Sequence, residues 1–133
     1  MDAQDFIEVV DDDEDVRRML VMVLESYGFK VRTHDGAQAY LACEKSKERR
    51  VMLLDVRMPK MTGVELQSHL VKTGDDIPVI FMSGESLPHE TLAAQQSNAI
   101  TFLWKPFRTT ELLDAIASGF RQYDAREGSS PAL

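Results

Sequence analysis

"VMLLD", residues 51–55, is a continuous apolar run that ends in a carboxylate. A strand with one face in solvent would alternate apolar and polar residues, because successive side chains point to opposite faces. An unbroken run of this length instead indicates a strand covered on both faces, as in a parallel sheet between two layers of helices. "VIFMS", residues 79–83, repeats the pattern. The two runs predict the interior of an α/β sheet.

On either side of these runs, the chain alternates between strand-like and helix-like spacing of its apolar residues. The segments expected to form strands are 6–10, 30–34, 51–55, 79–83 and 100–104. The segments expected to form helices are 16–27, 37–45, 64–73, 88–97 and 112–120, of which 88–97 has the weakest pattern. Strict alternation predicts parallel strands joined by right-handed crossovers, and therefore a doubly wound sheet with five strands and five helices.

Length and composition set further limits. A chain of 133 residues with 44% hydrophobic and 28% charged residues predicts one folded domain, here expected over 1–123, with 124–133 as a tail or linker. No apolar run reaches the ~20 residues that a membrane span needs, and "MDAQDF" at the start has no features of a secretory signal.

The cysteine count and the charge restrict compartment and partners. Cys43 is the only cysteine, which excludes an internal disulfide and fits a reducing cytoplasm. The net charge of −7 argues against direct binding of nucleic acid, because no basic surface would offset the phosphates. We therefore expect a cytoplasmic protein that contacts neither nucleic acid nor membrane.

Polar groups stand at the ends of four of the five predicted strands. They are Asp11 and Asp12 after the first, Asp55 after the third, Ser83 after the fourth and Lys105 after the fifth. Ligands of doubly wound sheets bind at the carboxyl ends of the strands, so these groups should meet at one edge. Carboxylates without a nearby His or Cys favour Mg²⁺ over zinc or copper. The three histidines, His34, His69 and His89, are expected at the surface.

Four motifs carry a resemblance to a known family. "VVDDDEDVRRML", "LLDVRMPKMTGVEL", "PVIFMSG" and "FLWKPF" resemble, in order and spacing, the receiver domains of two-component response regulators. The resemblance extends from about Phe6 to Phe120. It implies a flavodoxin-like sheet with strand order 2-1-3-4-5. It also implies a phosphoacceptor that takes a phosphoryl group from a sensor histidine kinase or a phosphotransfer protein, and that catalyses only its own phosphorylation and dephosphorylation.

The resemblance assigns roles at the strand ends. Asp55 would accept the phosphoryl group, and Lys105 would pair with its charge. Asp12 would ligate Mg²⁺ directly, Asp11 would act through water or by orienting the shell, and Asp55 and the backbone carbonyl of Arg57 would supply further oxygens. The remaining acids of "VVDDDED", residues 9–15, are expected to cap and begin the first helix.

The same resemblance implies a switch. Ser83 would be drawn towards the phosphoryl group and Phe102 would rotate into the space left behind, which would alter the surface of the fourth helix, fifth strand and fifth helix. The Lys105–Pro106 bond would be cis. Trp104 has two interpretations: an interface residue that favours a phosphorylation-dependent homodimer through this surface, or a residue packed beneath the fourth or fifth helix.

Three other classes of protein fit the sequence less well. An aspartyl-phosphate phosphatase would need a second Asp two positions after the first, where this chain has Arg57. A flavodoxin-like cofactor binder would need a first loop rich in Ser, Thr or Gly, whereas this loop is acidic and would repel phosphate. A metal-independent docking module would not need the complete set of strand-end groups.

Overall fold

The computed structural model describes residues 5–43, 48–84 and 101–128. The strands are β1 (Phe6–Val10), β2 (Lys30–His34), β3 (Arg50–Asp55), β4 (Val79–Ser83) and β5 (Thr101–Trp104). The helices are α1 (Glu14–Ser26), α2 (Ala37–Ala42), α3 (Gly63–Lys72) and α5 (Thr109–Gly128). The helix predicted over 88–97 lies outside the described residues. The other predicted elements are all present.

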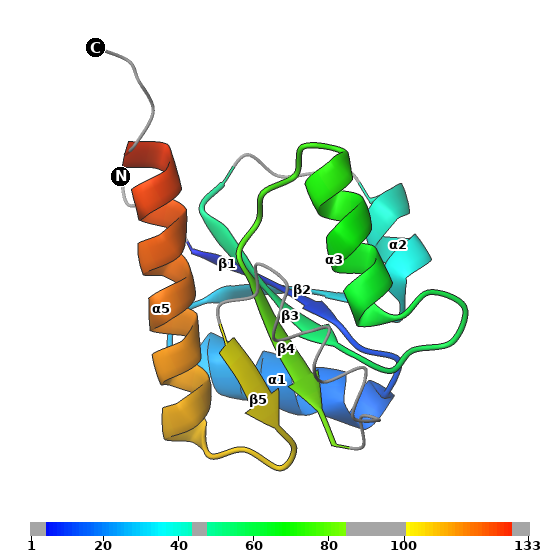
Figure 1. The fold of residues 1–133 in the computed structure, drawn as a ribbon. Coiled ribbons are helices and arrows are strands. Elements are labelled where there is room, and N and C mark those ends of the chain that lie inside the picture. The colour runs from blue at the N-terminus through cyan, green and yellow to red at the C-terminus, as the bar shows by residue number, and fades with distance from the viewer. Residues whose placement is uncertain (1–4, 44–47, 85–100, 129–133) are drawn as a thin grey trace.

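The five strands form one parallel sheet in the order β2-β1-β3-β4-β5, which confirms the predicted topology. Helices α1 and α5 cover one face of the sheet, and α2 and α3 lie on the other (Figure 1). The register aligns Val10 with Leu54 and Leu54 with Phe81. The last residues of β1, β3 and β4 therefore reach the same edge of the sheet.

Strand β3 separates two apolar cores. Val51 and Leu53 point into the core beneath α1 and α5, while Met52 and Leu54 point into the core beneath α2 and α3. All four side chains are fully buried. The unbroken apolar run of β3 thus results from burial on both faces, as the sequence predicts.

One histidine is not where the sequence placed it. His34 is buried, and its Nε2 lies 2.8 Å from Oε1 of Glu8, which is also buried. The His34 and Tyr40 rings are perpendicular to each other at a centroid distance of 5.2 Å. A carboxylate inside a sheet needs a polar partner, and the parallel pairing of β1 with β2 supplies one. The expectation of a surface residue was wrong for His34 and correct for His69, while His89 lies outside the described residues.

Helix α5 continues to Gly128, beyond residue 123, and Arg49 ties it to the sheet. The Arg49 guanidinium contacts Asp5 at 2.6 Å and both carboxylate oxygens of Asp124 at 2.7 and 2.8 Å. It also lies 4.4 Å from the centre of the Phe120 ring. These contacts hold the last turns of α5 against the edge at which the strands begin.

None of the helices in the described part of the chain combines the length and the apolar composition that crossing a bilayer requires.

Candidate functional site

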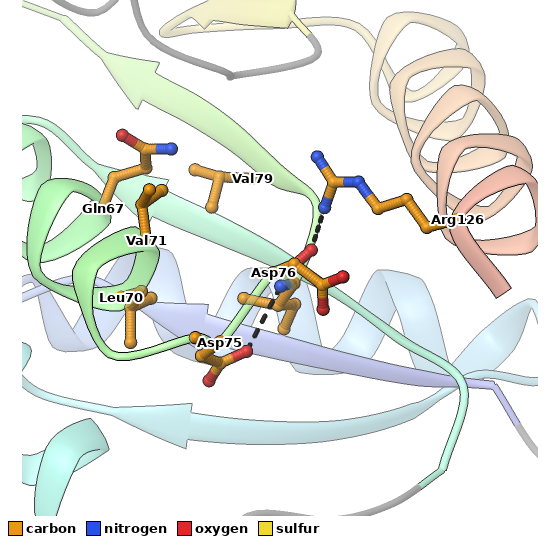
Figure 2. Close-up of a pocket in the computed structure, with 9 residues that line it drawn as sticks. Gln67, Leu70, Val71, Asp75, Asp76, Val79 and Arg126 are labelled. Atoms are coloured by element: carbon orange, nitrogen blue, oxygen red, sulfur yellow. Dashed lines mark hydrogen bonds between the residues drawn. The ribbon is translucent and has the colours of Figure 1, made fainter. Parts of the chain in front are cut away.

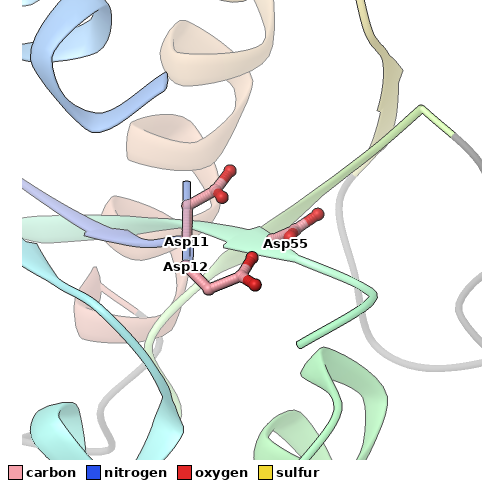
Figure 3. Close-up of side chains that lie close together, drawn as sticks. All are labelled: Asp11, Asp12 and Asp55. Carbon is pink, nitrogen blue, oxygen red and sulfur yellow. The ribbon is translucent and has the colours of Figure 1, made fainter. Parts of the chain in front are cut away.

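Three carboxylates converge at the carboxyl edge of the sheet. One oxygen from each of Asp11, Asp12 and Asp55 lies within 4.8 Å of the others (Figure 3). Asp11 and Asp12 follow β1, and Asp55 is the last residue of the neighbouring β3. Asp11 and Asp55 are buried, whereas Asp12 is exposed. Such a set of hard oxygen donors with one open side fits an oxygen-preferring divalent cation.

Lys105 places an ammonium group beside two of these acids. Its Nζ lies 2.8 Å from Oδ2 of Asp11 and 3.4 Å from Oδ1 of Asp55. Its backbone N–H donates to the Ser83 carbonyl, and the Lys105–Pro106 peptide bond is cis, as the resemblance implied. Burial alone would lower the pKa of Lys105, but the hydrogen bond to Asp11 and the charge of Asp55 outweigh it and raise the pKa. The ammonium therefore remains charged.

Asp55 is electrostatically unfavourable as an anion. Burial raises the pKa of its carboxyl from 3.8 to about 7, the Asp11 carboxylate adds to the rise, and Lys105 opposes it. Since a single ammonium does not balance three carboxylates, a further cation at this edge would favour the ionised form of Asp55. A buried carboxyl with a strongly shifted pKa beside a charged partner is typical of a reactive group.

Asp11 is held by all four of its hydrogen-bonding atoms. Its N–H donates to the His34 carbonyl at 3.1 Å, and its own carbonyl accepts from Nη1 of Arg17 at 2.8 Å. Its Oδ1 accepts from the Asp13 N–H at 2.9 Å, and its Oδ2 accepts from Lys105 at 2.8 Å. Asp11 is thus fixed by the protein itself, without any ligand.

The next acids form the start of α1. Asp13 is its N-cap, with a carboxylate that accepts from the N–H groups of Asp15 and Val16, and Glu14 and Asp15 occupy the first turn. This confirms the expectation that the later acids of "VVDDDED" cap and begin the first helix.

Gly63, at the end of "LLDVRMPKMTG", brings the start of α3 against the backbone that follows β3. Its N–H donates to the Val56 carbonyl at 2.8 Å, so the first turn of α3 rests on the backbone after β3. A Cβ on Gly63 would lie 2.2 Å from the Asp55 carbonyl oxygen. Only glycine fits there without displacing Asp55. Arg57 lies between them, exposed, in the β3–α3 loop.

The residues expected to form the switch lie on β4 and β5. Ser83 is buried at the end of β4, where its Cα pairs with that of Trp104. The ring of half-buried Phe102 lies 4.6 Å from the Trp104 ring and 6.4 Å from the Phe81 ring, measured between centroids. Trp104 is 51% exposed, which favours the interpretation as an interface residue over packing beneath α5, while the helix predicted over 88–97 lies outside the described residues.

A separate hollow of about 290 Å³ lies at the opposite end of the molecule (Figure 2). Leu70 and Val71 of α3, Asp75 and Asp76 before β4, and Arg126 of α5 contribute to its wall. Arg126 donates a hydrogen bond to the Asp76 carbonyl across it. Because these residues lie where the strands begin, the hollow takes no part in the strand-end site.

A parallel sheet of order 2-1-3-4-5 with two acids after β1, an Asp ending β3, a Ser ending β4 and a Lys after β5 defines the receiver class of signalling domains. The family model for the response regulator receiver domain matches residues 7–117. The chain belongs to this family and is a receiver domain of two-component signal transduction.

Similar proteins and structures agree. The response regulator protein TmoT of Ectopseudomonas mendocina is 33% identical over 132 residues, which cover 99% of this chain and 60% of TmoT. The transcriptional regulatory protein FixJ of Rhizobium meliloti is 36% identical over 83% of this chain and 54% of FixJ. The chain therefore spans little more than half the length of these relatives.

Among solved structures, the response regulator StyR superposes with a TM-score of 0.83 at 37% identity, covering 96% of this chain and 64% of StyR. FixJ-N superposes with a TM-score of 0.81 at 34% identity, covering 91% of this chain and 96% of FixJ-N. The chain thus matches the crystal structure of FixJ-N over almost the whole length of FixJ-N.

Proposed function

We propose that this domain accepts a phosphoryl group on Asp55, in a Mg²⁺-dependent reaction, from the phosphohistidine of a sensor histidine kinase or a phosphotransfer protein. The observation that carries the proposal is the convergence of Asp11, Asp12 and Asp55 with the Lys105 ammonium at one edge of the sheet. Membership of the receiver family supports it.

The three carboxylates have different roles in the proposed metal site. Asp12 is exposed and would ligate Mg²⁺ directly, with Asp55 and the Arg57 carbonyl as further ligands. Asp11 already accepts hydrogen bonds on both carboxylate oxygens, so it would orient the shell instead of replacing a water. When bound, Mg²⁺ would offset the repulsion between the Asp55 carboxylate and the incoming phosphoryl oxygens.

Asp55 supplies the nucleophile. A carboxylate oxygen forms a bond to phosphorus while the phosphorus–nitrogen bond to the donor imidazole breaks, and the electron pair stays on that nitrogen. Lys105 pairs with the charge on the phosphoryl oxygens, and the Ser83 hydroxyl turns towards one of them. The domain catalyses only its own phosphorylation and dephosphorylation.

The test uses a small phosphodonor with the purified domain. Mass spectrometry of the wild type should show one added phosphoryl group that requires Mg²⁺ and is lost in base, and Asp55→Asn should gain none. Asp114→Asn, which removes an exposed carboxylate of α5, is the matched control and should behave like the wild type. Phosphorylation of Asp55→Asn at the wild-type rate would overturn the proposal.

The output surface is proposed to comprise the helix predicted over 88–97, β5 and α5, with Phe102 as the switch residue and Trp104 beside it. A large exposed ring next to the switch favours an interface, here a homodimer that forms on phosphorylation. Sedimentation with and without a beryllofluoride mimic should show association that Trp104→Ala weakens. Tyr27→Ala, which removes another exposed ring at the end of α1, should not weaken it. Equal association in Trp104→Ala would exclude this interface.

A further inference from the structure

Arg17 makes a contact that its place in the sequence does not explain. It lies in α1, four residues after the N-cap Asp13, where the helix dipole disfavours a cation. Its half-buried side chain reaches back towards the start of the helix, and Nη1 donates to the Asp11 carbonyl at 2.8 Å. The next residue, Arg18, instead pairs with Glu14 on the open surface, with side chains 74% and 63% exposed.

The Asp11 carbonyl belongs to the peptide bond that joins Asp11 to Asp12. A hydrogen bond to this oxygen fixes the plane of the peptide, and the plane sets the direction in which Asp12 leaves the backbone. Within residues 5–43, 48–84 and 101–128, no group donates a hydrogen bond to the Asp12 carboxylate. The position of Asp12 therefore depends on its backbone.

We propose that Arg17 is a positioning residue, which holds the peptide between Asp11 and Asp12 so that the Asp12 carboxylate faces the same space as Asp55. The His34 carbonyl fixes the other side of Asp11 at 3.1 Å, so the turn is held from both directions. This role rests on the proposed function, since Asp12 needs a fixed position only if it binds a cation.

The experiment compares three variants by calorimetric titration with Mg²⁺ alone and by the Mg²⁺ dependence of Asp55 phosphorylation. Arg17→Met keeps the apolar stem and removes the donors, Arg17→Lys restores one cationic donor, and Arg18→Ala is the matched control. We expect Arg17→Met to weaken Mg²⁺ binding about tenfold, the size of effect typical of losing a charged hydrogen bond. The phosphorylation rate at saturating Mg²⁺ should stay within about twofold, because Arg17 does not touch the reacting atoms.

The outcomes separate the two proposals. Arg17→Lys should recover part of the Mg²⁺ affinity, and Arg18→Ala should match the wild type. Failure of the wild type itself to bind Mg²⁺ would overturn the proposed metal site. Wild-type affinity in Arg17→Met would overturn the role of Arg17 alone. A third outcome would also overturn the role of Arg17. If Arg17→Met and Arg17→Lys weaken Mg²⁺ binding equally and lower the melting temperature in EDTA equally, Arg17 is only a structural contact.

Discussion

Gly63 shows how closely α3 approaches the phosphoacceptor. A methyl group there would lie 2.2 Å from the Asp55 carbonyl oxygen and 3.1 Å from the Val56 Cα, both of them backbone atoms that cannot rotate away. We expect Gly63→Ala to lower the free energy of unfolding by about 1–3 kcal/mol, as overpacking does, and to slow phosphorylation because Asp55 shifts. Urea unfolding and the small-donor assay measure the two effects.

Gly36→Ala is the matched control for this change. Nothing lies within 4 Å of a Cβ built on Gly36, so the substitution should cost under about 1 kcal/mol. If Gly63→Ala has the stability and phosphorylation rate of the wild type, α3 can move away from the Asp55 backbone without loss of folding free energy.

The shifted pKa of Asp55 predicts a pH effect on the metal-free protein. The folded state binds this proton more tightly than the unfolded state, because the pKa rises from 3.8 to about 7 on folding. The contribution of Asp55 to stability therefore falls as the pH rises through this interval. In EDTA, Asp55→Asn should match the wild type near pH ~4 and exceed it above pH ~7, by on the order of 2 kcal/mol in urea unfolding.

Asp114→Asn should follow the wild type across the same pH range, because Asp114 is exposed. An advantage of Asp55→Asn that does not change with pH would show that the cost of Asp55 comes from something other than its charge.

At the scale of single residues, the sequence predicts the polar groups at the strand ends better than it predicts the residues that hold those groups in place. The convergence of Asp11, Asp55 and Lys105 needs only the direction and the order of the strands. The alternation of apolar patterns predicts the parallel direction, and the resemblance to receiver domains implies the order. The contact from Arg17 to the Asp11 carbonyl depends on one side-chain rotamer, and the burial of His34 depends on the contact of its side chain with Glu8 on the neighbouring strand. No local spacing rule encodes such contacts.

At the scale of elements, α5 depends on contacts with the sheet. Arg49→Met should loosen the last turns of α5. It removes the two hydrogen bonds to Asp124, the contact to Asp5 and the stacking over the Phe120 ring. We expect a lower melting temperature and faster amide exchange near the end of α5, with a smaller difference at high salt, since these ion pairs are partly exposed.

Arg121→Met provides the comparison within the same helix, because Arg121 bonds only to Ser118, one turn away, among the residues that the structure describes. Equal exchange at the end of α5 in the wild type and Arg49→Met would show that apolar packing alone holds the helix.

The same contacts explain which element boundaries the sequence could predict. Strand β4 matches its predicted limits, since a buried run ends where polar residues begin. Helix α5 begins at Thr109 and ends at Gly128, outside the predicted 112–120. Its apolar stripe indicates only the part that packs on the core, while partners distant in sequence such as Arg49 stabilise the last turns.

At the scale of the whole molecule, the fold was predictable because the strand patterns, the helix patterns and their order along the chain all indicate the same architecture. Buried strands, amphipathic helices and strict alternation all require a doubly wound parallel sheet, and the observed order β2-β1-β3-β4-β5 brings the predicted strand-end groups to one edge. The sequence did not predict the hollow at the opposite edge, since it depends on how α3 and α5 approach each other across the loop before β4.

Arg49 also has a consequence for the connectivity of the chain. By bridging Asp5 and Asp124, Arg49 brings the first and last described segments of the chain side by side, so a short linker could join them. A circular permutant that joins Gly128 to Asp5 through ~10 Gly/Ser residues, and opens at the exposed Tyr27–Gly28 turn, should keep the sheet. Circular dichroism and the phosphorylation assay should match those of the natural order, whereas an aggregated permutant would show that the α1–β2 turn must be continuous.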